Sequence, residues 1–350
     1  MLIYLDDHHC KQGLKPFSST RHVSDIRVGI LTIEEKWAQL LQLDSVGQLS
    51  FSDSISEEVI KVPANVIPTK NNYKSILALA KNGNVIEESD EIKILNYPWD
   101  IFQKNEWALN HDFEILTHGR TSQPIHASNA IQNEKNIFIE KGAIVNHCML
   151  NANNGPIYIG KNAHIMEGVF IRGPFSLGEE SVIKMGATIY GATSIGPFCV
   201  AGGEIKNSIM MQYSNKAHYG YLGDSVLGAW CNLGAGTTNS NLKNSAGEVS
   251  YKIDQSSSSI KVGNKAGLIM GDYSRAAINT SFNTGTIVGV SCNIFERGFP
   301  PVNIPDFTWG NEKYDFSKAL RDIENWMKLK NKTLSMDQID KLKNLYQTEN

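Results

Sequence analysis

The chain has 350 residues, of which 41% are hydrophobic and 20% charged, and its formal net charge is −3. This is the composition of an ordinary globular protein with room for two domains. The charge argues against a nucleic-acid-binding protein, because no basic stripe stands out. No stretch approaches the roughly 20 apolar residues that span a bilayer, and the first ten residues do not have the pattern of a signal peptide. We therefore expect a cytoplasmic protein with no membrane partner.

The cysteines support this expectation. They are odd in number and lack CxxC spacing, which argues against a disulfide framework or a zinc site of that type. We expect reduced, mostly buried thiols at Cys10, Cys148, Cys199, Cys231 and Cys292.

Residues 1–115 have the character of an α/β domain. Strands are expected at 3–5, 58–62 and 84–88. Helices are expected at 31–43, with Thr32 as a possible N-cap, and at 73–81. A connecting helix should then run from Pro98 to about His111.

A strict six-residue period of aliphatic residues follows. No α-helix has this period, and a flat strand alternates every two residues. A period of six puts one aliphatic side chain on each of successive short strands, so the chain must wind into a solenoid. The aliphatic positions are Ile159, Ile165, Ile171, Leu177, Ile183, Ile189 and Ile195.

The same pattern extends in both directions with interruptions. It begins weakly near Ile125, and the polar segment 239–259 is expected to leave the coil as a loop. The coils are expected to end near Ile294, where Pro300, Pro301 and Pro305 stop them. Two helical faces follow and are expected to cap the open end of the solenoid. Their members are Phe316, Leu320, Ile323 and Met327, and then Met336, Ile339, Leu342 and Leu345.

Within and after this periodic region the chain contains six short motifs: EIKNS (204–208), HYGYLGD (218–224), NLGAGT (232–237), MGDYS (270–274), AINT (277–280) and NTG (283–285). Together with the six-residue period, they resemble the hexapeptide-repeat acyltransferases, in particular the acetyltransferase half of the bifunctional N-acetylglucosamine-1-phosphate uridyltransferase / glucosamine-1-phosphate N-acetyltransferase family. The resemblance covers roughly residues 125–295 and looks like the archaeal-type and alternative bacterial branch.

This resemblance implies a mainly β fold. A left-handed parallel β-helix at 116–299 would follow a truncated nucleotidyltransferase-like α/β domain at 1–115, and a helical tail at 300–350 would complete the chain. The family normally forms homotrimers with active sites between neighbours. Its activity implies acetyl-CoA as co-substrate and a hexosamine 1-phosphate as acceptor, in the synthesis of a nucleotide sugar.

The chemistry of N-acetylation requires a base, because an ammonium has no lone pair with which to attack a thioester. A neutral imidazole suits this role at pH 7, and by resemblance His218 is that base. A sugar phosphate also needs converging cations. The residues implied for the sugar phosphate are Lys184, Lys206, Tyr221, Asn232 and Asn241. Those implied for acetyl-CoA are Ala235, whose backbone N–H would stabilise the oxyanion, Gly271 and Ala277.

Simpler interpretations of the same residues stay open. A lone histidine is usually a surface or structural residue, coil lysines are usually solvated, and asparagines often satisfy turns. Lys243 or Lys252 on the polar loop is a further candidate for the CoA phosphates. No metal site is expected, because the spacings of 21 and 17 between His126, His147 and His164 match no known ligand pattern.

The N-terminal residues leave a second function open. LKPFSSTR (14–21) and DIRVGILT (25–32) resemble the start of an alternative bacterial form of the same enzyme. Where sugar-phosphate nucleotidyltransferases have a glycine-rich phosphate loop, residues 6–13 contain one glycine. The alternatives are nucleotide transfer from UTP or dTTP, which would need Mg²⁺ and in which Arg21 and Arg27 are of interest, and a non-catalytic trimeric scaffold.

Overall fold

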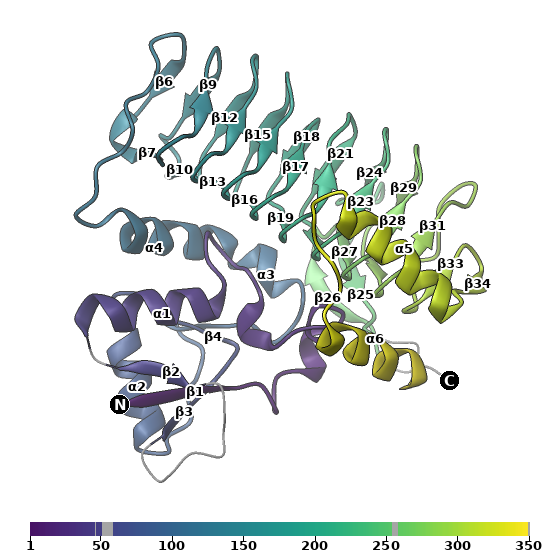
Figure 1. The fold of residues 1–350 in the computed structure, drawn as a ribbon, viewed down its shortest axis with the longest axis horizontal. Coiled ribbons are helices and arrows are strands. Elements are labelled where there is room, and N and C mark those ends of the chain that lie inside the picture. Colours follow the sequence, from purple (N-terminus) through teal and green to yellow (C-terminus); the bar gives the residue numbers. More distant parts are fainter. Residues whose placement is uncertain (46, 51–58, 254–257, 349–350) are drawn as a thin grey trace.

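The computed structural model describes residues 1–45, 47–50, 59–253 and 258–348. A parallel β-solenoid forms one side of the molecule, a small α/β domain packs against it, and two C-terminal helices lie beside its last coils (Figure 1). The fold class expected from the sequence, a parallel β-helix with an N-terminal α/β domain and C-terminal helices, is confirmed. No helix among the described residues is long and apolar enough to cross a membrane.

The six-residue period is the origin of the solenoid. Ile159 ends β10 (Ile157–Ile159), Ile165 ends β11 (His164–Ile165), and Ile171 lies in β12 (Phe170–Arg172), so successive members of the series lie on three different faces. One coil later, Leu177 pairs in register with Ile159, which makes this coil 18 residues long. All seven aliphatic residues of the series are at most 2% exposed. The period therefore gives each face one inward side chain per coil.

The three faces are numbered in the order in which the chain meets them. Face 1 contains β7 (Ile137–Ile139), β10, β13 (Phe175–Leu177), β16 (Thr193–Ile195), β19 (Ile209–Met210), β22 (Val226–Leu227), β27 (Leu268–Met270), β30 (Thr286–Val288) and β32 (Asn303–Ile304). Face 2 contains β8 (Ile144–Val145), β11, β14 (Val182–Ile183), β17 (Val200–Ala201), β20 (Asn215–Lys216), β23 (Asn232–Leu233), β28 (Arg275–Ala276), β31 (Asn293–Ile294) and β33 (Thr308–Trp309), with β34 (Glu312–Lys313) antiparallel at its end. Face 3 contains β6 (Ala130–Gln132), β9 (Met149–Asn151), β12, β15 (Thr188–Tyr190), β18 (Glu204–Lys206) and β21 (Tyr221–Gly223), continued by the pair β24 (Thr238–Asn239) and β29 (Ser281–Phe282).

The N-terminal domain is built on a small parallel sheet in the order β2 (Gln48–Ser50), β1 (Leu2–Asp6), β3 (Val59–Pro63). A short antiparallel pair, β4 (Val66–Ile67) and β5 (Lys93–Ile94), lies beside it. The helices are α1 (Ile33–Asp44), α2 (Tyr73–Lys81), α3 (Asp100–Gln103) and α4 (Asn105–Thr117). Thr32 and Glu35 form a reciprocal capping box at α1, which confirms the predicted cap.

Two local predictions for this domain need correction. No strand forms at 84–88, because only Ile86 is buried there and the alternation that holds a strand against a core is missing. The connecting helix is broken at Lys104 into α3 and α4, and α4 continues to Thr117. The predicted domain boundary at 115 thus falls within α4, and the division 1–115, 116–299 and 300–350 stays a prediction. Residue 58 of the predicted strand 58–62 lies outside the described residues.

Helix α4 joins the N-terminal domain to face 1 (Figure 1). The fully buried side chain of Asn105 accepts a hydrogen bond from the Gly29 N–H at 2.7 Å and donates one to the Ala192 carbonyl at 2.8 Å. The Ser194 hydroxyl of β16 also donates to the Asn105 carbonyl oxygen at 3.0 Å. One amide therefore connects a loop of the domain to two positions of the solenoid.

A buried ion pair forms a second connection. The Arg21 guanidinium donates to the Asp272 carboxylate, and the Thr20 hydroxyl donates to the same group. The Ala229 N–H of the solenoid contributes another hydrogen bond at 2.8 Å. The side chains of Arg21 and Asp272 are 9% and 4% exposed. The segment 14–21, which resembles the start of an alternative bacterial form of the enzyme, thus holds the N-terminal domain against the solenoid in this chain.

The last coil continues beyond the predicted stop. Ile287 and Gly289 of the preceding coil donate to the carbonyls of Val302 and Ile304, so β32 belongs to face 1 in spite of the prolines around it. Proline lacks an N–H, but it keeps its carbonyl as an acceptor. A final strand that mainly accepts hydrogen bonds therefore tolerates prolines at its ends.

In the predicted helical faces, Ile323, Met327 and Leu342 are buried, whereas Met336 is 72% exposed. The two predicted helices themselves form, as α5 (Phe316–Lys328) and α6 (Met336–Thr348). Their position differs from the expectation, because α5 lies along the last coils and not across their open end (Figure 1). The Arg275 guanidinium of β28 is 5.5 Å from the centre of the Trp326 ring and donates to the Asp322 carbonyl. The amphipathic face of α5 thus covers face 2.

The polar segment after β24 leaves the coil as predicted. Its described part contains an antiparallel pair, β25 (Val249–Tyr251) and β26 (Ile260–Gly263). Tyr251 stacks on Trp99 at 5.1 Å, and the Gln103 side chain donates to the Val262 carbonyl. The segment therefore folds back onto the N-terminal domain.

We expect the substitution Arg21→Met to lower the free energy of unfolding by about 3–5 kcal/mol, because it leaves the buried Asp272 carboxylate without its cation. Urea unfolding checks this value. The control is Lys341→Met, which removes an exposed ion pair with Asp337 and should cost less than about 1 kcal/mol. Equal effects of the two substitutions would contradict the docking role of Arg21.

Candidate functional site

The corner between faces 2 and 3 carries four predicted site residues on four of five successive coils. The Cβ of Lys184 lies 3.1 Å from the position that a Cβ on Gly202 would occupy, and Gly202 lies in turn against the Ala217 carbonyl. One coil further, the Gly236 N–H donates to the Tyr219 carbonyl, which puts Ala235 next to the turn that contains His218. The Gly234 N–H donates to the Ala276 carbonyl, so Ala277 follows on the next coil. Lys184, His218, Ala235 and Ala277 therefore line one edge of the solenoid.

His218 lies in the turn between β20 and β21, and its side chain is exposed in the single chain. Large apolar side chains beside it are also exposed: Met185 is 65%, Tyr219 79% and Ile278 69% exposed. All three belong to turns of the same corner. Apolar groups gathered at one edge are typical of a surface that another molecule covers.

A polar cluster lies on face 3. The Tyr190 hydroxyl donates to Glu204 Oε1 at 2.6 Å, and the Lys206 ammonium lies 5.7 Å from the centre of the Tyr190 ring. The hydrogen bond to Glu204, together with burial, raises the pKa of Tyr190 to about 12. Lys206 is half-buried and is the cation of this cluster.

Tyr221 and Asn241 form the upper part of the same cluster. The Asn241 amide donates to the Tyr221 hydroxyl at 3.0 Å and to Asp224, which also accepts from Asn207 at 2.7 Å. Burial, and then the charge of Asp224, raise the pKa of Tyr221. The Tyr221 ring lies directly over Gly223, where an added Cβ would come within 2.2 Å of the hydroxyl oxygen. A side chain at the glycine of the YLGD motif would therefore displace the Tyr221 ring.

Asn232 and Gly271 lie apart from these groups. Asn232 points outward from face 2, in register with Asn215 below and Arg275 above. Gly271 is buried at the corner between faces 1 and 2, where an added Cβ would lie 2.7 Å from the Gly289 carbonyl and 3.0 Å from Pro16. The packed N-terminal domain covers this position, so Gly271 is part of the domain interface in this structure. Its contact with acetyl-CoA stays a prediction.

The loop lysines are placed as follows. The Lys243 ammonium donates to the Glu248 carbonyl within its own loop. The Lys252 carbonyl accepts from Asn303 of β32, which places that residue beside face 1. Lys252 is therefore remote from the corner between faces 2 and 3.

Three polar groups of the cluster were not among the predicted site residues, namely Tyr190, Glu204 and Asp224. Tyr190 and Glu204 were hidden because their partnership depends on the pairing of β15 with β18 across one coil. Asp224 ends the YLGD motif, so its position in the motif was a signal that pointed to it.

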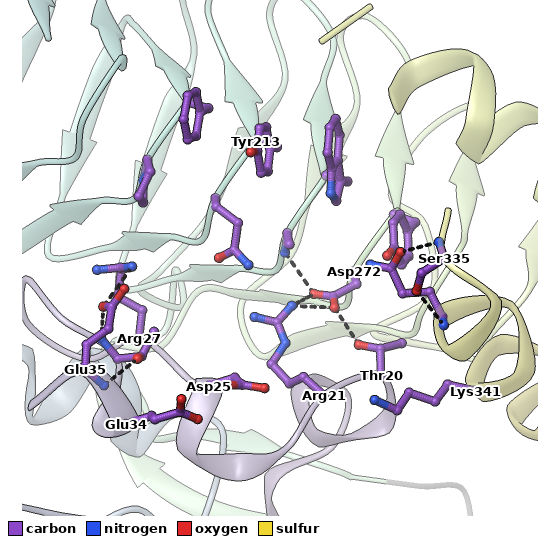
Figure 2. Close-up of a pocket in the computed structure, with 18 of the residues that line it drawn as sticks. Thr20, Arg21, Asp25, Arg27, Glu34, Glu35, Tyr213, Asp272, Ser335 and Lys341 are labelled. Carbon is purple, nitrogen blue, oxygen red and sulfur yellow. Dashed lines mark hydrogen bonds and ion pairs between the residues drawn. The ribbon is translucent and has the colours of Figure 1, made fainter. Parts of the chain in front are cut away.

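A cavity of about 650 Å³ separates the N-terminal domain, the solenoid and α6. Its solenoid wall is an aromatic ladder in which Phe198 stacks on Tyr213 at 4.8 Å and Tyr213 on Trp230 at 4.2 Å. Asp25 and Glu34 lie on the opposite wall (Figure 2). All three aromatic residues have a φ near +60°, which is rare for bulky residues. The stacking of equivalent positions on successive coils helps to offset this backbone cost.

The N-terminal domain contains a smaller cavity of about 280 Å³ at the carboxyl ends of β1 and β3. Asp6, His9, Cys10 and Lys61 are among its lining residues. Burial raises the pKa of the Cys10 thiol to about 12, so this thiol is protonated at neutral pH. Within the described ranges, no group of three or more His, Cys, Asp or Glu side chains is arranged to hold a metal ion.

The two arginines of interest for nucleotide transfer are engaged elsewhere. Arg21 is paired with Asp272, and Arg27 donates to the Ile30 carbonyl and, at 3.3 Å, to Glu35. Neither guanidinium lines the cavity at the end of β1 and β3.

Comparison with known proteins supports the resemblance. A family model described as sugar nucleotidyl transferase matches residues 2–90 and 74–121. The bifunctional protein GlmU of Methanocaldococcus jannaschii is 31% identical over 198 residues, which are 56% of this chain and 41% of that protein. The bifunctional sugar-1-phosphate nucleotidylyltransferase/acetyltransferase of Sulfurisphaera tokodaii is 27% identical over 228 residues, 61% of this chain and 49% of that protein. A GlmU of Methanococcus maripaludis is 28% identical over 241 residues, 67% of this chain and 52% of that protein.

The chain thus spans about half the length of the curated relatives it matches. The resemblance inferred from the motifs is confirmed at this level: the chain is similar to bifunctional sugar-1-phosphate nucleotidyltransferase/acetyltransferases, and its first third matches a sugar nucleotidyl transferase model.

The face 3 cluster yields a titration prediction. Replacing Glu204 by Gln removes the carboxylate that holds the Tyr190 proton and repels its phenolate, so the pKa of Tyr190 should fall from about 12 towards the ordinary value of about 10. NMR titration of ¹³C-labelled tyrosine rings measures this shift, and Tyr190→Phe identifies the signal. An unchanged titration in the Glu204→Gln variant would show that the hydrogen bond does not govern this pKa.

Proposed function

We propose that the chain is an acetyl-CoA-dependent N-acetyltransferase that acts on a hexosamine 1-phosphate, with glucosamine 1-phosphate as the first candidate. The observation that carries this proposal is the alignment of Lys184, His218, Ala235 and Ala277 along one edge of the solenoid. The similarity to relatives named as acetyltransferases supports it.

In this proposal His218 acts as the general base. Its imidazole takes a proton from the sugar amine while the nitrogen attacks the acetyl carbonyl of acetyl-CoA. The exposed ring is accessible to both substrates. Collapse of the tetrahedral intermediate breaks the C–S bond, and the departing CoA thiolate takes the proton back from the imidazolium. The products are the N-acetyl sugar phosphate and free CoA.

The oxyanion and the phosphate need separate partners. The backbone N–H of Ala235, on the coil after His218, is the proposed donor to the oxyanion. Lys206 on face 3 and Lys184 at the corner are the proposed cations for the phosphate, while Tyr221 and Asn241 would hold the sugar ring. Asn232 points outward from face 2, so it can bind the sugar phosphate only if the substrate extends from face 3 around the corner between faces 2 and 3.

We also propose that the active form is a homotrimer. The exposed Met185, Tyr219 and Ile278 beside His218, and Phe170 on face 3, are the apolar side chains that a neighbouring copy would cover. A neighbour would also enclose the exposed imidazole, and exclusion of water strengthens the electrostatic contacts of a reaction.

The first test is the substitution His218→Ala. We expect the rate of thiol release from acetyl-CoA with glucosamine 1-phosphate to fall by about 10²–10⁴-fold, the usual contribution of a general base. The control is His164→Ala on face 2, three coils before His218, which should keep the wild-type rate. Undiminished turnover in the His218 variant would exclude the proposed base.

The second test concerns the phosphate. We expect Lys206→Met to raise the KM for glucosamine 1-phosphate by about 10–100-fold, because the loss of a charge-assisted hydrogen bond costs about 1.5–3 kcal/mol. The KM for acetyl-CoA should stay the same. Lys141→Met on the first coil is the control, and an equal change in both variants would remove Lys206 from the site.

Nucleotide transfer is the second candidate function. It is favoured by the family-model match and by the cavity at the carboxyl ends of β1 and β3, the place where parallel α/β sheets bind ligands. The assay is pyrophosphate release from UTP, or dTTP, with N-acetylglucosamine 1-phosphate and Mg²⁺. If no pyrophosphate is released, the N-terminal domain has no nucleotidyltransferase activity, and its remaining role is to pack against the solenoid.

The non-catalytic alternative is tested by binding. A scaffold would bind neither acetyl-CoA nor the sugar phosphate, so calorimetric titration with acetyl-CoA separates it from both enzymatic functions.

A further inference from the structure

One lysine lies where the described coils otherwise have an aliphatic residue or alanine at the inward position of face 2. Lys216 of β20 occupies the inward position of face 2 and is 1% exposed. The pairing of face 2 strands puts the same position on other coils at Val145, Ile165, Ile183, Ala201, Leu233, Ala276 and Ile294.

The Lys216 ammonium reaches from the core to the corner between faces 2 and 3. It donates to the Gly202 carbonyl at 3.0 Å and to the His218 carbonyl at 2.6 Å. It therefore connects the turn that carries His218 to the turn of the preceding coil.

The two turns differ in length, which explains why such a connection is needed. Four residues, 217–220, join β20 to β21, and four residues also join β14 to β15. Only Gly202 and Gly203 join β17 to β18. The turn that contains His218 thus lies over a shorter turn. Within residues 217–220, the Gly220 carbonyl is the only backbone group that bonds to the backbone of the coil below, through the Glu204 N–H at 3.3 Å.

Glycine makes the close stacking of these turns possible. A Cβ on Gly203 would lie 2.7 Å from the His218 carbonyl oxygen, 2.9 Å from the Lys216 ammonium and 3.0 Å from the Gly220 carbonyl oxygen. Gly203 also has a φ of +73°. The absence of a side chain at Gly203 therefore leaves room for the Lys216 ammonium and for the His218 carbonyl to which it donates.

The charge of Lys216 has no carboxylate partner among the described residues. Burial lowers its pKa to about 8. A buried cation stabilised only by carbonyl dipoles is costly, whereas an aliphatic residue, as on the neighbouring coils, would fill the position without that cost. The hydrogen bonds to the turn are what distinguishes lysine here.

We propose that Lys216 is a positioning residue: from inside the solenoid it holds the carbonyls of Gly202 and His218 and thereby fixes the turn that presents the His218 imidazole. Its effect on the reaction rate rests on the proposed function of His218. Its effect on the turn does not depend on any activity.

The test is Lys216→Met, which keeps the length of the side chain and removes the donors. Amide hydrogen exchange should become faster in residues 217–220 and stay the same in the strands of the early coils. In the acyl-transfer assay, kcat should fall by about 10–100-fold, because a small displacement of a catalytic group has this effect. The KM values should change less than about twofold. The control is Ile165→Met at the same inward position three coils earlier, which should change neither measurement.

The outcomes separate the two proposals. Unchanged exchange in 217–220, or a wild-type kcat, in folded Lys216→Met would overturn the positioning role. A change in KM with a wild-type kcat would also overturn it.

If the wild-type protein has no acyl-transfer activity, the proposed function fails, and the exchange measurement still decides the role of Lys216. If the Met variant does not fold, Lys216→Gln replaces it; its shorter amide does not span both carbonyls, so the same changes are expected, and their absence in folded protein overturns the proposal.

Discussion

The stacking of nearly equal coils is the constraint on which the rest of the structure depends. Each coil adds one inward side chain per face, and the backbone of each strand pairs with the strands before and after it. Because the coils repeat, residues about 18 positions apart become neighbours, and corners become straight edges. The edge with His218 and Ala235 is a direct result, and so is the aromatic ladder that ends in Trp230. The solenoid thus turns a local period into long rows of similar groups.

Two irregularities interrupt these rows of stacked residues. The turn with His218 lies over the shorter turn at Gly202 and Gly203, and the only inward lysine of face 2 in the described part of the chain is found there. A second irregularity is the long segment after β24, which packs on the N-terminal domain through Tyr251. One irregular coil therefore contains a residue of the candidate site, His218, whereas the regular coils contain the buried aliphatic residues that stabilise the solenoid.

The N-terminal segment shows how a family motif can acquire a different physical role. Residues 14–21 and 25–32 resemble the start of an alternative bacterial form of the bifunctional enzyme, and the domain matches a family model described as sugar nucleotidyl transferase. In the folded chain Arg21 is buried against Asp272 of the MGDYS motif, and Pro16 lies next to Gly271. Two motifs that resemble different halves of one enzyme family thus contact each other. Their side chains stabilise the domain interface, in which Gly271 is buried.

The solenoid, the helices α1, α2, α5 and α6, and the loop after β24 were predictable from the amino-acid sequence, because each follows from a local period, a cap or a break in a period. The remaining features depend on tertiary contacts. Whether Lys216 points into the core, whether Tyr190 meets Glu204, and whether Gly271 is covered all depend on which coil or domain lies alongside. The sequence also did not predict that β32 continues the ladder despite the prolines around it. Its carbonyls accept hydrogen bonds from N–H groups of the preceding coil, and only the folded structure brings those donors close. Contacts between residues far apart in the chain are set by packing, and a local pattern carries no information about the partner.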